Sequence, residues 1–186
     1  MMKKTMGLMV GLLALNGVCF AVLAQEKSET NLIGNGSFEE GMKYWGGRPP
    51  ARITVDDSTS TDGKYSMKLD GTTTETAIWM AAGQSLTSGR IEPSTEYILK
   101  GDIRRTTAKG SVGIVVLEKP KEKTNNDWTY HWCGKNPEKG LNAWEHFELK
   151  FKTNPKVDDA MVQLYNIQSG GIVWFDNLRL MEVPAQ

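Results

Sequence analysis

The feature that most constrains the fold is a series of short stretches in which apolar and polar residues alternate, with turn-forming residues between them. In the clearest stretch, Phe147, Leu149 and Phe151 alternate with charged residues, as in a strand with one buried face. After residue 24, no stretch sustains helical periodicity. About ten strands without a substantial helix predict an all-β fold, an antiparallel sandwich or barrel. The predicted strands are 32–33, 52–55, 65–69, 76–81, 97–104, 111–117, 128–132, 147–151, 162–165 and 171–180.

The opening stretch, residues 31–41, is interrupted by Gly34 and Gly36. Glycine adopts backbone angles that other residues avoid, which suits a bulge or a tight bend in an edge strand. We therefore expect a short edge strand that turns Phe38 inward and leaves Glu39 near a bend.

The closing stretch, residues 171–180, contains an acidic residue in an apolar pattern. Strict alternation places Asp176 on one face with Ile172, Trp174, Leu178 and Leu180. A buried carboxylate is costly unless it is paired or bound to a cation. We interpret Glu39 as its partner, with a calcium ion between them. The alternative is that Asp176 accepts a hydrogen bond from a backbone amide while Glu39 is solvated.

Four motifs occur in a characteristic order along the chain. They are N-L-I-G-N-G-S-F-E-E-G at 31–41 followed by Trp45, D-G-K-Y-S-M-K-L at 62–69, Trp144 with Phe147 and Phe151, and V-W-F-D-N-L-R-L at 173–180. Together they resemble carbohydrate-binding modules of the family 4/9 type. The resemblance implies a galactose-binding-like jelly-roll β-sandwich that binds glycans and is often associated with glycoside hydrolases.

The resemblance also implies a structural calcium ion. Glu39 and Asp176 match the usual ligand positions of the family. Calcium takes six to eight oxygen ligands, including backbone carbonyls. We expect such carbonyls near Ser37 and Lys64.

The first residues have the pattern of an export signal. Lys3 and Lys4 precede an apolar run that is too short to span a membrane comfortably, and small residues end at Ala24. We predict a secretory signal peptide at 1–24, a flexible tether at 25–30 and one β-sandwich domain at 31–183, in a secreted or periplasmic protein. A lipoprotein signal at Cys19 is the alternative, although Val18 stands where a small residue is usual.

Charge and cysteine content limit the classes of partner. The 22 basic and 22 acidic residues form no basic block, which argues against nucleic acid, and no second apolar run is long enough for a membrane span. Removal of the signal leaves Cys133 as the single cysteine, so no internal disulfide is expected. We interpret Cys133 as a small buried residue, with an intermolecular bridge as the alternative.

The sequence gives little support for catalysis. The two histidines, His131 and His146, lie in no hydrolase motif. The acidic doublets are neighbours in sequence, and neighbours on a strand point to opposite faces, whereas glycoside hydrolysis needs two facing carboxylates. His131 lies among aromatic residues and is a candidate for bonding a sugar, or is incidental.

Aromatic residues with polar neighbours are the candidates for a glycan surface. Trp128, Tyr130 and Trp132 alternate and are flanked by polar loops, so all three point to one side of a strand. Trp79 alternates with alanines, which leaves its ring free as a platform or as a filler of the core. Three polar residues are expected to line the same concave face: Arg104, Gln163 and Tyr165. The other tryptophans, Trp45, Trp144 and Trp174, are interpreted as packing residues.

These observations predict a monomeric, non-catalytic module that binds a polysaccharide or oligosaccharide by aromatic stacking. Two alternatives remain. One is a β-sandwich that uses its aromatic residues to bind protein. The other is a hydrolase of glycosyl bonds built on the same scaffold.

Overall fold

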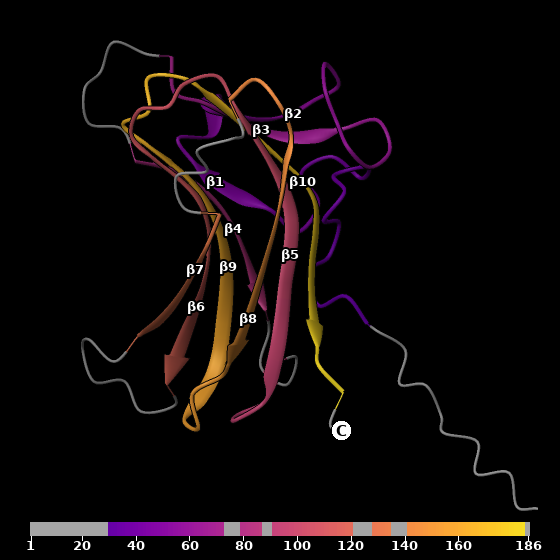
Figure 1. Cartoon of the computed structure of the whole chain (residues 1–186), viewed down its shortest axis with the longest axis vertical. Helices are drawn as coiled ribbons and strands as arrows, with labels where there is room; N and C mark the ends of the chain where they lie inside the picture. The colour runs from indigo at the N-terminus through magenta and orange to yellow at the C-terminus, as the bar shows by residue number, and fades with distance from the viewer. Residues whose placement is uncertain (1–29, 73–78, 87–90, 121–127, 135–140, 185–186) are drawn as a thin grey trace, which may run out of the picture.

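The computed structural model describes residues 30–72, 79–86, 91–120, 128–134 and 141–184. The strands form two antiparallel five-stranded sheets. The sheets pack face to face (Figure 1). The predicted all-β jelly-roll sandwich is confirmed, and the one helical element among the described residues is a single 3-10 turn, η1 (Pro50–Arg52). The predicted signal peptide and nearly all of the predicted tether lie outside the described residues. No helix in the described ranges is long and apolar enough to cross a membrane.

The first sheet, here called sheet A, has the strand order β1-β4-β9-β6-β7. The second, sheet B, has the order β2-β3-β10-β5-β8. Sheet A consists of β1 (Gly46–Arg48), β4 (Trp79–Leu86), β6 (Ser111–Pro120), β7 (Thr129–Cys133) and β9 (Val157–Ile167). Sheet B consists of β2 (Ile53–Asp56), β3 (Ser66–Asp70), β5 (Glu96–Arg105), β8 (Glu145–Lys152) and β10 (Ile172–Glu182).

The core lies between the sheets and is built by the alternation seen in the sequence. In β5, Tyr97, Leu99 and Ile103 are buried, whereas Lys100 between them is half-buried and faces outward. The predicted inward turn of Phe38 is confirmed, because its side chain is fully buried. These side chains join inward-facing residues of both sheets in one hydrophobic cluster.

The segment at 32–33 is not a strand, and this prediction was wrong. The N–H of Leu32 donates to the carbonyl of Leu180, and the N–H of Leu178 donates to the carbonyl of Gly36. Between them, however, the Asn31 side chain accepts the N–H of Leu180 at 2.9 Å. An amide side chain thus replaces one backbone partner, and the opening segment lies along β10 without forming a regular ladder (Figure 1).

The strict alternation predicted for the closing strand was also wrong. A register shift between Asp176 and Arg179 marks a β-bulge, and Asn177 has a positive φ of 52°. Leu178 therefore packs in the core with Leu180, while Asp176 lies opposite Asp102 of β5. An extra residue at a bulge reverses the direction of every later side chain relative to simple alternation. A smaller error concerns β4, which continues through Gly83 to Leu86.

We predict that Gly36→Ala destabilises the fold. A Cβ at this position would lie 2.1 Å from the backbone carbonyl oxygen of Leu178. Backbone displacement of this kind typically costs about 1–3 kcal/mol. The free energy of unfolding, measured by denaturant titration, should fall by this amount. Gly46→Ala is the matched control, because nothing lies within 4 Å of a Cβ there, and its stability should stay close to that of the original protein.

Candidate functional site: the outer face of sheet A

Exposed aromatic side chains gather on the outer face of sheet A at the edge strand β7. Trp128, Tyr130 and Trp132 are 39%, 49% and 44% exposed. The rings of Tyr130 and Trp132 are nearly parallel, with centroids 6.0 Å apart and an interplanar angle of 11°. Lys119 covers one side of Trp128, with its Nζ 5.4 Å from the ring centroid. Tyr130 and Trp132 lie on one face of β7, opposite Leu117 and Val115 of β6, whereas Trp128 precedes the strand.

Tyr165 of β9 extends this row of rings toward the middle of the sheet. Its ring meets that of Trp132 edge to face, with centroids 5.3 Å apart. The ring lies over Gly113, where a Cβ would come within 2.9 Å of the Tyr165 hydroxyl. Tyr165 is only 1% exposed, and this burial raises the pKa of its phenol. Tyr165 therefore supports the exposed rings from the side. We call Tyr130, Trp132 and Tyr165 the aromatic cluster.

A shallow groove of about 480 Å³ lies on the same side of the sandwich, toward the opposite edge of sheet A. Gln163 of β9 is directly opposite Gly83 on one neighbouring strand and Val115 on the other. Val115 is in turn opposite Trp132. Residues that are opposite each other in an antiparallel ladder share a face, so the groove and the aromatic cluster adjoin at Gln163. The groove is lined by Gly46, Gly47, Arg48, Ala81, Gly83, Ser85, Met161 and Gln163.

The sequence reasoning missed the floor of this groove. Small residues form this floor, so a ligand would meet main-chain atoms there rather than bulky side chains. They are Gly46, Gly47, Ala81 and Gly83. A glycine inside a strand pattern often marks a place where another molecule approaches the backbone, and Gly83 carried this signal. Trp79 begins β4 opposite Ile167, but its side chain lies outside the described part of the structure.

Arg104 does not lie on this face, which corrects the expectation that it shares a surface with Gln163 and Tyr165. It belongs to β5 of sheet B. Its Nη1 donates to Thr59 Oγ1 at 2.7 Å, and its guanidinium lies 5.3 Å from the ring centroid of Trp174. A polar position on a strand shows which face it occupies but not which of the two sheets contains the strand.

The residues predicted to hold calcium lie elsewhere, where the chain ends meet the loop before β3. Asp176 is fully buried, and its Oδ2 accepts the N–H groups of Thr61 and Asp62 at 2.6 and 2.9 Å. Glu39 is exposed, and its Oε1 accepts the N–H groups of Lys64 and Tyr65, both at 2.8 Å. Burial raises the pKa of Asp176, although these hydrogen bonds oppose the shift.

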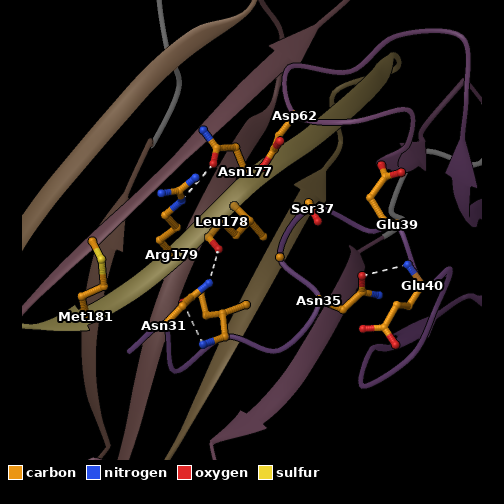
Figure 2. A pocket seen from close by; sticks show the side chains of 12 residues that line it. Asn31, Asn35, Ser37, Glu39, Glu40, Asp62, Asn177, Leu178, Arg179 and Met181 are labelled. Atoms are coloured by element: carbon orange, nitrogen blue, oxygen red, sulfur yellow. Dashed lines mark hydrogen bonds between the residues drawn. The ribbon is translucent and has the colours of Figure 1, made fainter. Parts of the chain in front are cut away.

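These residues fit a calcium ion only in part. Ser37 and Glu39 line a hollow of about 450 Å³, with Asp62 and Asn177 also in its wall. Figure 2 shows Ser37 and Glu39 on the side opposite Asn177. Both predicted carboxylates already accept amide hydrogens, as in the alternative weighed from the sequence for Asp176. Among the described residues, no group of three or more His, Cys, Asp or Glu side chains is arranged to hold a metal.

Two carboxylates face each other on sheet B, but they are covered by the chain itself. Asp102 and Asp176 are directly opposite on β5 and β10, but they are only 8% and 0% exposed. The hydroxyl of Thr61 lies between them, 2.7 Å from Asp102 Oδ2 and 3.2 Å from Asp176 Oδ2. A glycosidase needs its carboxylates on either side of a bound sugar. This pair is instead part of the packing of the 57–65 loop on sheet B.

The sequence matches the family described as "Carbohydrate binding domain" (CBM_4_9) over residues 30–169. A curated relative, the tRNA(Glu)-specific nuclease WapA of Bacillus subtilis subsp. natto (strain BEST195), is 23% identical over 162 residues. That alignment covers 82% of this chain but only 7% of the much longer relative.

Solved structures share the fold at low sequence identity. "Family 16 Carbohydrate Binding Module-2" has a TM-score of 0.64 and 23% identity, covering 82% of this chain and 100% of that chain. The CBM22-1 xylan-binding domain of Paenibacillus barcinonensis Xyn10C has a TM-score of 0.56 and 18% identity, covering 85% and 97%. The enzymatically active domain of tailspike protein 4 of bacteriophage CBA120 has a TM-score of 0.62 and 16% identity, covering 82% and 21%.

We predict that Cys133 is unreactive in the folded protein. Burial raises the pKa of its thiol from 9.0 to about 11, so at neutral pH it carries about a hundredfold less thiolate than an ordinary cysteine. Reaction with a chromogenic disulfide reagent should be slow in the native protein and rapid after unfolding in denaturant. Rapid reaction of the native protein would instead show that β7 opens readily.

Proposed function

Because this chain belongs to the family of carbohydrate binding domains, we propose that it binds a polysaccharide or oligosaccharide, without catalysing a reaction, on the outer face of sheet A. The supporting observation is the continuity of the groove with the aromatic cluster through Gln163. A pyranose ring has apolar C–H faces and a polar rim, so it needs an aromatic surface beside hydrogen-bonding side chains. The outer face of sheet A offers both.

The two halves of the face have different tasks in this proposal. Tyr130 and Trp132 supply flat, exposed rings for stacking, which gives affinity. In the groove, a ligand lies close to a floor of glycine and alanine. Three polar side chains of the groove bond hydroxyl groups and give selectivity: Arg48, Ser85 and Gln163.

We also propose that residues 1–24 direct export of the protein and that the exported domain is a monomer. Sequencing of the mature N-terminus in the periplasm or medium tests the first, and light scattering tests the second.

Binding is tested by affinity electrophoresis against soluble β-glucans, xylans and mannans. We expect one class of polymer to retard the protein and Trp132→Ala to weaken the affinity about tenfold or more, because central aromatic anchors dominate such surfaces. Gln163→Ala should weaken it less. Arg104→Ala is the control on sheet B and should leave retardation unchanged. Loss of retardation in Arg104→Ala, with unchanged retardation of Trp132→Ala, would assign binding to sheet B.

The second candidate function is that the same aromatic residues bind a protein, in which case no polymer should retard the chain. Tyrosine and tryptophan are also the commonest anchors of protein interfaces. Absence of retardation by every polymer, together with capture of a specific protein that Trp132→Ala abolishes, would favour this second candidate.

We also propose that calcium binds between the chain ends, with Glu39 and Asp176 as carboxylate ligands. A cation there would offset the cost of burying the Asp176 charge. Glu39 Oε2 has no hydrogen-bond partner among the described residues and is therefore available to a cation. The role is structural, because this region is built around β10 of sheet B and the opening segment, away from the residues that line the groove.

Calcium binding predicts a chelator-sensitive melting temperature. Calcium at 100 times its dissociation constant stabilises the fold by about 2.7 kcal/mol. This corresponds to roughly 5–10 °C for a domain of this size. Glu39→Gln should remove the difference between calcium and chelator, whereas the neighbouring Glu40→Gln should retain it. If chelator leaves the melting temperature of the original protein unchanged, the two carboxylates act only through the amides of the 61–65 loop.

A further inference from the structure

The inward-facing side of β7 makes a polar side-chain contact that is not part of the proposed binding surface. β7 is an edge strand of five residues, and β6 is its only pairing partner among the described strands. Tyr130 and Trp132 point outward from it, so His131 between them points toward the interior. His131 Nε2 lies 2.7 Å from Oε1 of Glu118.

Glu118 is a buried acid, only 1% exposed. Its second oxygen, Oε2, accepts the N–H of Asn154 at 2.9 Å, in the turn between β8 and β9. The nearest lysine in sequence, Lys119, pairs with Asp159. With Glu118 ionised, its carboxylate only accepts hydrogen bonds, so the His131 tautomer that fits this contact carries its proton on Nε2. A buried carboxylate is costly without such donors, so Glu118 holds His131 in place.

The ring of His131 also reaches the other sheet. It stacks on Phe151 of β8, with centroids 4.2 Å apart, and Phe151 stacks on the buried Tyr97 of β5. β7 belongs to sheet A, whereas β8 and β5 belong to sheet B. His131 is therefore fixed at two points, by a hydrogen bond within its own sheet and by a ring contact across the sandwich.

We propose that His131 and Glu118 are positioning residues for the aromatic cluster. Their hydrogen bond sets the rotation of β7 about its own axis, and so sets the planes of the Tyr130 and Trp132 rings that meet a sugar. The outward rings and the inward imidazole are on consecutive residues, so loss of the inward bond frees the strand to twist. The proposal rests on the proposed glycan-binding function, but its effect on ring geometry is measurable without a ligand.

The test separates the hydrogen bond from the ring contact. His131→Phe keeps an aromatic ring for Phe151 but removes the donor, whereas His131→Gln keeps a donor but removes the ring. Glu118→Gln is a second, nearly isosteric way to weaken the bond should His131→Phe fail to fold. The other histidine provides a matched control, because His146 Nδ1 lies 2.9 Å from Asp102 Oδ1 on sheet B.

Two readouts are needed for each variant. Near-ultraviolet circular dichroism reports the surroundings of all tyrosine and tryptophan rings, so the spectrum of each protein is compared with that of the same protein carrying Trp132→Phe, and the difference reports Trp132. Affinity electrophoresis on the best polymer reports binding. We expect His131→Phe and Glu118→Gln to change the dichroism and to weaken binding about tenfold, because each weakens a bond to a buried charged group. His131→Gln should retain binding within about twofold, and His146→Gln should match the original protein.

The outcomes distinguish this proposal from the proposed function. If the original protein binds glycan and His131→Phe binds equally well with unchanged dichroism, the positioning role is overturned and glycan binding stands. If the original protein binds no polymer, glycan binding fails, while the dichroism still decides whether the link orients the rings. Equal losses in His131→Phe and His131→Gln would overturn the specific role of the hydrogen bond.

Discussion

The hydrogen bonds between the opening segment and β10 are the constraint on which the closed sandwich depends. Asn31 and Gly36 bond the backbone of β10 at Leu180 and Leu178. The same segment reaches sheet A through Gly34, whose N–H and carbonyl both bond the side-chain amide of the buried Gln84. One segment without regular secondary structure thus holds β10 of sheet B to β4 of sheet A along a side of the core.

Most of the fold follows from local pattern, because alternation determines which side chains each strand buries. The errors have a common physical origin. Asn177 adopts a positive φ at a bulge that its tertiary contacts determine, including a bond to Asp102, so strict alternation misplaced Leu178. The opening stretch has the composition of a strand, yet a side-chain amide from Asn31 takes one of the bonds that a strand would make.

The candidate site was predictable to the extent that it depends on spacing along one strand. Tyr130 and Trp132 share a face because they are two residues apart, and their exposure agrees with that reasoning. Arg104 was assigned to the wrong surface because pattern does not distinguish two sheets. The sheets do differ in what covers them. The 57–65 loop packs on sheet B, where Thr59 bonds Trp144 as well as Arg104, while sheet A presents the groove.

The glycine floor of that groove has a consequence for how such a surface diverges between related proteins. Gly47 is constrained by packing, since a Cβ there would lie 3.1 Å from the backbone oxygen of Ala81 and would displace the Ile53 side chain, whose Cδ1 is at 2.5 Å. Gly46 and Gly83 are not fixed in this way, because no atom stands closer than 3.4 Å to a Cβ at either position. A side chain gained at Gly46 or Gly83 is therefore compatible with the sandwich and occupies the groove instead. If the proposed glycan lies in this groove, substitutions at these two positions would shorten the ligand that the scaffold accommodates without disturbing its core.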